Sequence, residues 1–570
     1  MTKFIAAICL FLGWIMPDHY SPWISWQNEL LPFFALFLLS WYGLIKKGFS
    51  GSILVPAAAF PLSALGLIAV IQGVIGHIPF AGDAFVFMLY ISLCVMCITL
   101  GFSTKTEILS VGALMPTREK SARNVALEYL ACVLLVGALA SAVVSFAQVL
   151  SLWDGSPWII RMPSRRPGGN IGQPNHLATL LLMGVISLLY LYECGLLKAW
   201  SSGLVLPVFA FALASTESRT MWLSFLLLLG WWFSKRQELA FKLSPWMALL
   251  TGIVFFTLFW WWPSFLDLIH LSGINVGSEK AVSTAAGMRL VMLPQLLEAV
   301  AQRPWWGWGI REIAAAHNAV AHAYPVSEAF TYSHNIVLDL ALGIGLPLTV
   351  LFLVVIGIWL WFRIRGVNNL SSWYCLAMIL PLALHSMLEF PFAYAYFLAP
   401  VMFALGALEK ELGSKFSWRI GVPHVASLLL VTSILAIWSV VEYVEIEEDF
   451  RVARFEALRI GQTPESYERP HVFLLTQLDA LLNGARIVPR PGMTIENLEL
   501  ARKVALRYPW AATQNRYALS LALNGNREEA LRQLQVMRAM EGEVRFSHIR
   551  KYWQSLAQDK YPQLQQIVLP

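Results

Sequence analysis

Long apolar runs separated by short polar segments dominate the chain. Most runs hold roughly 17–25 residues, the length with which an α-helix crosses the ~30 Å hydrocarbon core of a bilayer. A transmembrane β-barrel would show short segments of alternating polarity instead. The pattern therefore predicts an all-α polytopic membrane protein with about 13 transmembrane helices. The predicted spans are roughly 3–17, 30–45, 52–76, 84–102, 124–151, 175–193, 200–216, 219–234, 245–263, 334–361, 372–388, 391–409 and 421–443.

Composition agrees with this fold class. The 570 residues are 57% hydrophobic and 13% charged, with a mean hydropathy of +0.60, whereas soluble domains are about half apolar and a quarter charged. The net charge of +6 is scattered, so nucleic acid is not an expected partner. The six cysteines lie in or beside apolar runs without metal-ligand spacing, and we expect no metal and no cofactor.

Short-loop lysines and arginines predict how the chain is threaded, because they favour the cytoplasmic side. When the spans alternate, five groups of basic residues fall on one side, which we take as cytoplasmic. The N-terminus is then cytoplasmic and the chain from about 444 is periplasmic. The five groups are Lys46 and Lys47; Lys105, Arg118, Lys120 and Arg123; Lys235, Arg236 and Lys242; Arg363 and Arg365; and Lys410, Lys415 and Arg419.

Several arginines break this rule, since they fall on the predicted outer side. They either meet lipid phosphates at the interface or form a pocket for an anionic ligand. Arginine suits an anion pocket because its planar guanidinium grips phosphate through two hydrogen bonds and stays charged. These residues are Arg161, Arg165 and Arg166 in the 152–174 loop, Arg219 at the start of a span, and Arg289 and Arg303 in the 264–333 loop.

The segment "RRPGGNIGQPNH" ends the first of these loops. Its glycines allow close backbone approach to a ligand, and Pro174 and Asn175 begin an apolar helix whose N-terminus attracts anions. Gln173, Asn175 and His176 are therefore candidate cavity residues. An ordinary loop with a helix cap is the alternative. The next outer turn, "STESRTMW", carries Arg219, which could instead pair with Glu217.

The long 264–333 loop contains "GMRLVMLPQLLEAVAQRPWWGWGI". Met288 to Ala301 has apolar residues at helical spacing, which predicts an amphipathic helix on the membrane surface. Trp305, Trp306 and Trp308 would then lie at headgroup depth. We interpret His317 and His322 as loop histidines in an alanine-rich context.

Two further groups lie at predicted outer helix ends. The first comprises Tyr332, His334 and Asn335 at the mouth of the 334–361 span. The second comprises His385 and Glu389, which are four residues apart and so share one helix face. His334 is either catalytic or a hydrogen-bonded packing residue, and the outer arginines favour a functional role. His385 and Glu389 are either catalytic or a structural salt-linked pair.

These blocks, in this order, resemble the O-antigen ligase and polymerase superfamily of bacterial envelope enzymes. The resemblance covers roughly 160–410. The blocks that carry it are "GGNIGQPNHLAT", "STESRT", "GMR…RPWWGWGI", "YSHNIVLDLALGIG" and "HSMLEFPFAYAYF". With the outer tail, the chain most resembles PglL-type protein O-oligosaccharyltransferases. The resemblance implies a membrane glycosyltransferase (GT-C-like) fold in the inner membrane. It also implies en bloc transfer of a glycan from polyprenyl (undecaprenyl) diphosphate to Ser or Thr of a periplasmic or pilin-like protein.

By that resemblance, His334 matches the essential histidine of the family's long periplasmic loop. Arg219 and Arg289 match arginines that face the carrier diphosphate, and Arg165 and Arg166 are secondary contacts. The chemistry fits, because fixed arginines can stabilise the charge that develops on a departing diphosphate without a metal. An imidazole can take or orient the proton of the acceptor hydroxyl. A single in-line displacement would invert the anomeric carbon.

The tail from about 444 is charged and helical in period, which divides the chain into a transmembrane catalytic domain, 1–443, and a periplasmic helical domain, 444–570. It contains a predicted helical hairpin, with Tyr517, Ala518 and Leu521 before a turn at Asn524-Gly525 and Ala530 and Leu534 after it. The hairpin resembles a tetratricopeptide-type unit, and fewer than three units do not form a free-standing solenoid. The tail either recognises the acceptor protein or caps the membrane domain.

Three other functions remain open. An O-antigen ligase transfers glycan to lipid A-core, and an O-antigen polymerase extends the glycan, both from the same donor. A transporter of the lipid-linked glycan would place its binding residues near the midplane of repeated halves. The sequence shows no such repeat and its polar candidates gather at one face, so transport is the least favoured of the three.

Overall fold

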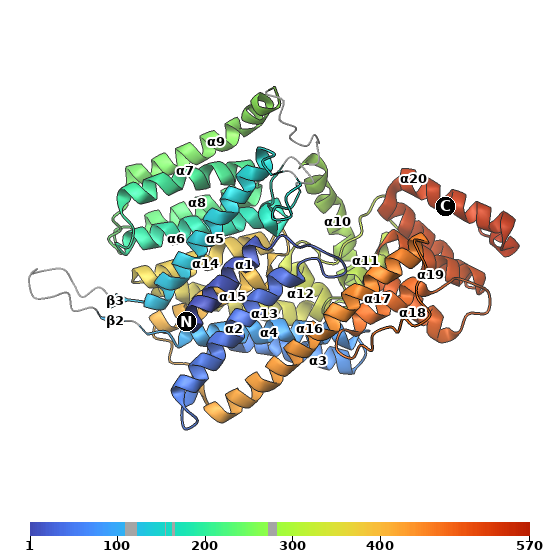
Figure 1. Cartoon of the computed structure of the whole chain (residues 1–570), viewed down its shortest axis with the longest axis horizontal. Coiled ribbons are helices and arrows are strands. Elements are labelled where there is room, and N and C mark those ends of the chain that lie inside the picture. Colours follow the sequence, from blue (N-terminus) through green and yellow to red (C-terminus); the bar gives the residue numbers. More distant parts are fainter. Residues whose placement is uncertain (106, 109–121, 154, 162–165, 272–281) are drawn as a thin grey trace, which may run out of the picture. The chain divides into compact units, whose positions relative to one another are not determined.

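The computed structural model describes residues 1–105, 107–108, 122–153, 155–161, 166–271 and 282–570. Nearly all of its regular structure is helical (Figure 1). The chain forms two compact units. Unit 1 comprises Met1–Ser63, Tyr90–Lys280 and Gly357–Ser433, and unit 2 comprises Ala64–Leu89, Ala281–Ile356 and Ile434–Pro570.

The division falls within four helices, and the others belong to one unit each. The divided helices are α3 (Phe60–Val74), α4 (Ala81–Phe102), α13 (Leu346–Gly366) and α16 (Val422–Leu458). Unit 1 holds α1 (Thr2–Ile15), α2 (Trp26–Lys47), α5 (Val125–Val149), α6 (Pro174–Glu193), α7 (Ala199–Ser215), α8 (Arg219–Lys235), α9 (Pro245–Leu271), α14 (Leu370–Ser386) and α15 (Ala395–Glu411). Unit 2 holds α10 (Val282–Gln302), α11 (Ile313–Ala321), α12 (Ile336–Ile344), α17 (Thr476–Arg486), α18 (Ile495–Arg507), α19 (Ala511–Leu523) and α20 (Arg527–Asp559).

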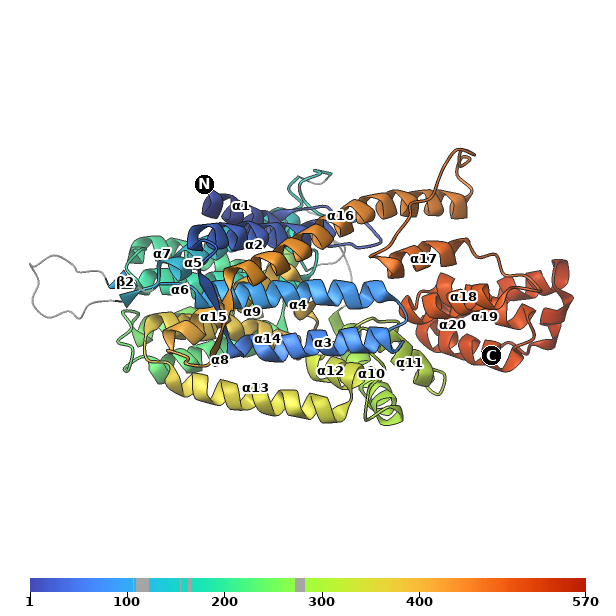
Figure 2. The ribbon, with the colours of Figure 1, turned by 90° about the horizontal axis from the view of Figure 1, so that it is seen from below.

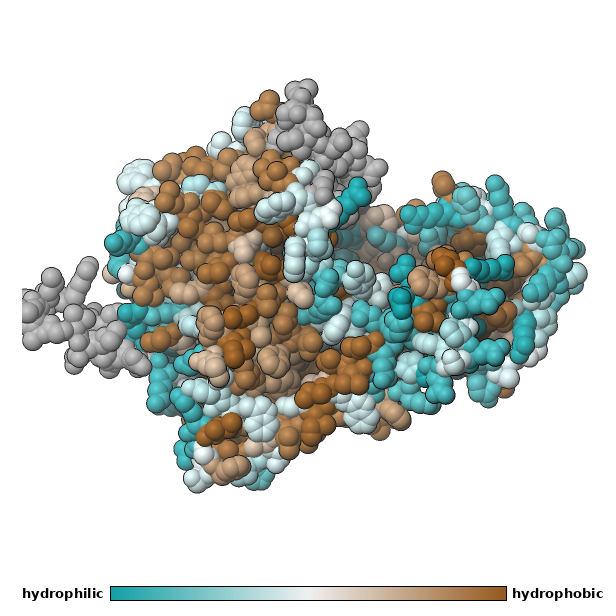
Figure 3. All heavy atoms as spheres, viewed as in Figure 1, coloured by the Kyte–Doolittle hydropathy of each residue, from teal (hydrophilic) through white to brown (hydrophobic). Residues whose placement is uncertain are grey.

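The described part of the chain contains eight helices long and apolar enough to cross a membrane: α2, α3, α4, α5, α6, α9, α13 and α16. Shorter apolar helices are α1, α7 and α14. Brown, apolar surface covers much of unit 1 in Figure 3, whereas the surface over the tail helices is mostly teal. The prediction of a polytopic helical membrane protein is confirmed. Each of the thirteen predicted spans contains a helix, and the number that cross the membrane stays a prediction.

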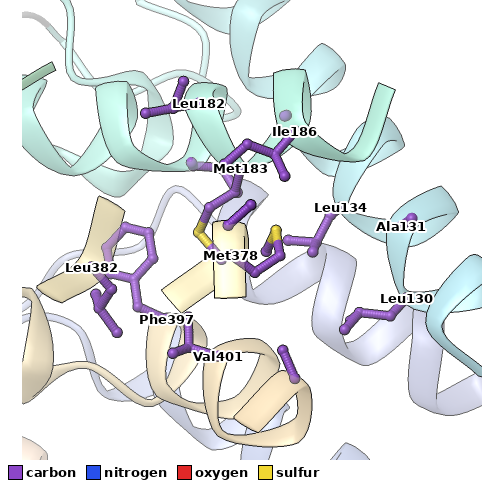
Figure 4. Packing of buried hydrophobic residues seen from close by; sticks show 14 of the residues in the cluster. Leu130, Ala131, Leu134, Leu182, Met183, Ile186, Met378, Leu382, Phe397 and Val401 are labelled. Carbon is purple, nitrogen blue, oxygen red and sulfur yellow. The ribbon is translucent and has the colours of Figure 1, made fainter. Parts of the chain in front are cut away.

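The core of unit 1 is built from α5, α6, α14 and α15. Leu134, Met183, Met378 and Phe397 come from these four helices and point toward one another (Figure 4). α6 is the most enclosed candidate span, since 78% of its apolar window is buried. Such burial fixes the N-terminus of α6, where the segment "RRPGGNIGQPNH" ends.

Two short antiparallel ladders complete unit 1. β1 (Ser52–Pro56) pairs with β4 (Ser417–Gly421), and β2 (Glu107–Ile108) pairs with β3 (Ala122–Arg123). The predicted span 52–76 therefore begins as a strand, and its helix α3 starts at Phe60. The pairing places the chain before α3 beside the chain before α16.

In unit 2, glycines allow a loop to pack on the junction of α12 and α13. Gly345, with φ 82°, ends α12, so the predicted span 334–361 is two helices and α13 alone has the length of a span. A Cβ on Gly345 would lie 2.3 Å from the carbonyl oxygen of Trp305. One on Gly307, with φ 70°, would lie 2.6 Å from that of Leu342. The "GWG" and "GIG" motifs therefore let two backbones touch.

The tail is continuous with α16, because this helix extends past the predicted domain boundary at 443 and ends at Leu458. The Glu442 carboxylate accepts hydrogen bonds from the backbone N–H groups of Phe473, Leu474 and Leu475, at the start of α17. Figure 2 shows α17–α20 packed together. The predicted hairpin is confirmed, because Tyr517, Ala518, Leu521, Ala530 and Leu534 are buried in one core.

Candidate functional site

The loop before α6 is held by side chains from α5 and by α1. The Gln148 amide donates to the Gly169 carbonyl at 3.1 Å and accepts from the Gly169 N–H at 2.9 Å. Asn170 is buried and donates to the Ile15 carbonyl at 2.7 Å. Gly169 has φ 58°, which favours glycine. The glycine-rich segment is therefore a fixed structure against the ends of α1 and α5.

Arg166 connects this loop to two other segments of unit 1. Its Nε donates to the Thr216 carbonyl at 2.6 Å, and an Nη donates to the Asn175 side chain at 3.0 Å. Asn175 in turn donates to a carboxylate oxygen of Glu389 at 3.4 Å. The guanidinium is thereby oriented between the turn after α7 and the N-terminus of α6, two features predicted to lie on the same side of the membrane.

Two histidines that the sequence made candidates, His176 and His385, lie next to each other in unit 1. His176 and His385 are buried, and their ring centroids lie 5.4 Å apart. His385 Nδ1 hydrogen-bonds the Thr179 hydroxyl at 2.8 Å, whereas His176 Nε2 has no partner among the described residues. Tyr394 packs its ring 4.8 Å from that of His176.

Helix ends set the positions of the remaining candidates in unit 1. Gln173 is the N-cap of α6 and accepts from the His176 N–H at 2.8 Å, so one of the free helix donors is satisfied within the chain. Arg219 is exposed at the first position of α8. Arg165 lies outside the described residues. The shared helix face inferred for His385 and Glu389 is wrong, because α14 ends at Ser386 and the two side chains make separate bonds to α6.

The other predicted residues lie in unit 2, where Tyr332, His334 and Asn335 form the turn that starts α12. Asn335 is the N-cap and accepts from the N–H groups of Val337 and Leu338. The Ser333 hydroxyl donates to the Asn335 carbonyl at 2.8 Å. His334 has φ 60°, an uncommon conformation for a residue with a side chain. Such strain persists only where the surroundings enforce it, and it gathers at functional sites.

Asp339 belongs to this turn, and the sequence interpretation missed it. Its Oδ1 accepts from the Ser333 N–H at 2.7 Å, while Oδ2 is buried with no hydrogen-bond partner in the described chain. Burial raises the pKa of the Asp339 carboxyl to about 6, against the lowering effects of its Ser333 bonds and of the nearby His334. The signal that could have revealed it was an ionisable residue inside a predicted span.

Arg289 lies half-exposed on α10, which is helical as predicted. The helix does not only face a membrane surface, because Leu296 and Val300 pack with α11 and α12. Of the three tryptophans, Trp305 and Trp306 are exposed, whereas Trp308 donates its indole N–H to the Ala299 carbonyl at 2.8 Å. Arg289 is therefore carried by an element packed on the helix that follows His334.

His317 is not a loop histidine. It lies on α11, is 1% exposed and hydrogen-bonds both Gln295 and Ser327 at 2.8 Å. Burial lowers its pKa to about 3, so it is neutral at physiological pH. Such a residue packs the α10–α11 core. Within the described ranges, no group of three or more His, Cys, Asp or Glu could hold a metal ion.

Three families match parts of the chain. They are described as "Protein glycosylation ligase" over residues 167–192, "O-Antigen ligase" over 203–353 and "Virulence factor membrane-bound polymerase, C-terminal" over 373–554. Two curated relatives come from Acinetobacter baylyi. A general O-oligosaccharyltransferase is 26% identical over 93% of this chain and 90% of its own length. A ComP-specific O-oligosaccharyltransferase is 27% identical over 70% of each chain.

Proposed function

This chain belongs to the PglL-type protein O-oligosaccharyltransferases of the O-antigen ligase superfamily, and on that premise we propose that it glycosylates proteins at Ser or Thr hydroxyl groups. The donor is a glycan linked to a polyprenyl diphosphate such as undecaprenyl diphosphate, and it is transferred as a whole. The acceptor is a periplasmic or pilin-like protein. The similarity to a general O-oligosaccharyltransferase covers 93% of this chain and so includes most of the tail, which favours a protein acceptor over lipid A-core.

The observation that carries the proposal is the turn that holds His334. The left-handed backbone at His334, the Asn335 cap and the hydrogen bond from the Ser333 N–H to the Asp339 carboxylate together fix the backbone of His334 at the start of α12. A general base must be oriented toward the proton it takes, and the energy stored in the strained turn is consistent with such a requirement. The carboxylate of Asp339 would stabilise the imidazolium that forms when His334 accepts a proton.

We assign the arginines to the diphosphate. Arg219 and Arg289 are its main contacts in this proposal, and Arg166 and Arg165 are secondary. Arg166 is already oriented by Thr216 and Asn175, which lowers the ordering cost of binding an anion. Fixed guanidinium groups stabilise the negative charge that grows on the leaving diphosphate more than the charge of the bound donor.

The reaction follows from these roles. The acceptor hydroxyl transfers its proton to His334 as its oxygen attacks the anomeric carbon of the first sugar. The bond from that carbon to the diphosphate oxygen breaks, and the electron pair leaves with the polyprenyl diphosphate. One displacement inverts the anomeric centre. In this proposal the supporting residues act within their own units. Those of unit 1 hold the loop before α6, and those of unit 2 hold the turn before α12; they are Gln173, Asn175, His176, His385 and Glu389 in unit 1, and Tyr332 and Asn335 in unit 2.

We place the enzyme in the bacterial inner membrane with about 13 spans, a GT-C-like fold and a cytoplasmic N-terminus. Residues 1–443 form the membrane domain with the periplasmic loop 264–333, and 444–570 form a periplasmic, tetratricopeptide-like tail. Contacts within unit 1 support this threading. Predicted cytoplasmic ends bind one another, as when Lys235 donates to the Val367 carbonyl and Arg363 pairs with Glu409 at 2.6 Å.

Matched variants test these assignments with purified enzyme and a fluorescent polyprenyl-diphosphate glycan. We expect His334→Gln to bind the donor like the wild type and to lose at least ~100-fold in transfer rate, the range of one general base. Arg219→Gln should weaken donor binding, whereas Arg490→Gln, an exposed tail arginine, should change neither. Full transfer by His334→Gln would contradict the assignment of the base.

The matches to the O-antigen ligase and polymerase families support a second candidate function, which is glycan transfer to an acceptor other than a protein. The same donor chemistry would serve transfer to lipid A-core or to a second carrier-linked glycan. The acceptor that receives the sugar decides between them, because the donor site is common to all three reactions.

A further inference from the structure

A cavity of about 340 Å³ lies within unit 2, between the outer loop and the tail. Its walls come from the segment before α4, from α11 with the turn preceding it, and from α18 and α20. The charged and polar side chains that line it are His77, Arg303, Glu312, Asn318, Arg502, Lys503 and Arg532. None of them belongs to the candidate site described above.

The lining is predominantly basic. Arg502 pairs with Glu499 at 2.7 Å and Arg532 pairs with Glu529 at 2.6 Å, which orients both guanidinium groups. Arg303 stacks over the Trp308 ring at 4.1 Å, and Lys503 lies at 4.0 Å from Glu499. The lining thus carries four cationic side chains. The carboxyl groups near them number three, which are the two ion-pair partners Glu499 and Glu529 and the lining residue Glu312.

Glu312 adds an observation of a different kind. It is 4% exposed, and its Oε1 has no hydrogen-bond partner among the described residues. Burial, with the neighbouring Asp83, raises its pKa to about 8. At neutral pH it is therefore mainly a carboxylic acid, which donates a hydrogen bond instead of repelling an anion. An unsatisfied buried oxygen in a basic cavity is the arrangement expected of a site that a ligand completes.

We propose that this cavity binds a carboxylate side chain of the acceptor protein and so docks an acidic acceptor segment on the tail. The inference rests on the proposed function. Two of the four walls are the tail helices α18 and α20, and another, α11, belongs to the same loop that leads to His334. The volume admits one or two side chains. An acidic residue near the acceptor hydroxyl would then raise the occupancy of the enzyme by its acceptor.

The direct test measures binding to the full-length protein in detergent. The probe is a fluorescent peptide of glycine and serine with three aspartates, and its control carries asparagines instead. In the cavity variant, Arg303→Gln is combined with Lys503→Gln. The matched control variant combines Arg490→Gln with Lys551→Gln, the same charge change at exposed tail positions outside the cavity.

We expect the wild type and the control variant to bind the aspartate peptide alike, and the cavity variant to bind at least tenfold more weakly. The asparagine peptide should bind the wild type, the cavity variant and the control variant with the same affinity. Equal binding of the two peptides, an equal loss in the control variant, or tighter binding of a uronic-acid oligosaccharide of the same charge would overturn the proposal.

Transfer kinetics separate this inference from the proposed function. With an acidic acceptor protein, the cavity variant should raise the KM for acceptor at least tenfold and leave kcat unchanged. An acceptor whose acidic residues have been neutralised should show the same raised KM with the wild-type enzyme as the acidic acceptor shows with the cavity variant. If the wild type transfers glycan to protein but the variant keeps its KM, the docking inference fails alone. If the wild type transfers to no protein, the proposed function fails whatever the peptide data show.

Discussion

Two buried carboxyl groups in unit 2 bear most directly on function at the scale of single residues. Asp339 lies in the His334 turn, and Glu312 lies in the basic cavity. Both have raised pKa values, and burial is the largest cause in each case. Burial raises the free energy of an ionised carboxylate, so such groups are retained only where something compensates for the cost.

Replacing Asp339 with asparagine tests its role beside His334. The amide can still accept from the Ser333 N–H, but the negative charge that stabilises an imidazolium is lost. We expect kcat to fall about tenfold, which corresponds to ~1.4 kcal/mol, with little change in either KM. Steady-state kinetics and the apparent Tm check this. An unchanged kcat, or a lower Tm with unchanged KM and kcat, would show that Asp339 only supports the turn.

Glu312→Gln should change stability in a pH-dependent way. The pKa of Glu312 is about 8 in the fold and near 4.3 in an unfolded chain. The fold therefore binds this proton more tightly, and its stability falls as pH rises from about 4.5 through 8. Glutamine removes that loss of stability. The apparent Tm of the variant should therefore be higher than that of the wild type at pH 8.5 and nearly equal to it at pH 4.5.

The charged groups around Glu312 are Asp83 on α4, Arg311 beside it, and Arg502 and Arg507 on α18. They are present in both the wild type and the variant, so comparing the two at each pH isolates Glu312. A gain in Tm of equal size at both pH values would argue against the raised pKa.

The sequence made His334 a candidate but not Asp339. His334 was selected because arginine loops predicted on the same side bracket it and because it matches the family's histidine, whereas Asp339 lies within an apolar run that was interpreted as one span. Likewise, His317 resembles a loop histidine until α10 and α11 pack around it. Burial depends on tertiary contacts, and the order of residues alone does not specify them.

At the scale of elements, the close contact between the "GWG" turn and the α12–α13 junction should be sensitive to a single methyl group. Gly345→Ala would place Cβ 2.3 Å from a backbone oxygen at a positive φ. We expect a loss of about 2 kcal/mol or more in stability, seen as a lower apparent Tm. Gly357→Ala is the control, since its Cβ would meet open space in α13 and should be neutral or slightly stabilising. Equal effects of the two changes would contradict this.

The membrane helices were predictable from the length of the apolar runs, because local hydrogen bonds and a lipid environment leave an apolar run few other structures. The break at Gly345 and the strand at Ser52–Pro56 were not predicted. The strand depends on its partner at Ser417–Gly421, far away in the sequence. The link of Arg166 to Thr216 and Asn175 is of the same kind, since it joins segments through side-chain geometry.

At the scale of the whole molecule, the threading makes a prediction that labelling can check. In a variant with the exposed Cys132 changed to serine, we expect Lys551→Cys to react with a membrane-impermeant maleimide in intact spheroplasts. Lys47→Cys, at the predicted cytoplasmic end of α2, should react only after the membrane is permeabilised. The reverse pattern would place the tail in the cytoplasm and exclude a periplasmic transferase.

The predicted site residues fall in both compact units: Arg166, Arg219, His176 and His385 in unit 1, and Arg289 and His334 in unit 2. The order of motifs along the chain was enough to list them, because most of the motifs lie at or next to a helix end, whereas Arg289 lies within α10. It was not enough to assign them to units, since the chain passes between the units within four helices.

The most direct test of the central claim is a transfer assay with two competing acceptors. Purified enzyme receives polyprenyl-diphosphate glycan, a pilin-like protein and lipid A-core, and mass spectrometry locates the sugar. We predict one intact glycan on Ser or Thr of the protein, with none on lipid A-core and none with His334→Gln. Glycan on lipid A-core alone, or a lengthened glycan still on its carrier, would contradict the account and identify a ligase or a polymerase.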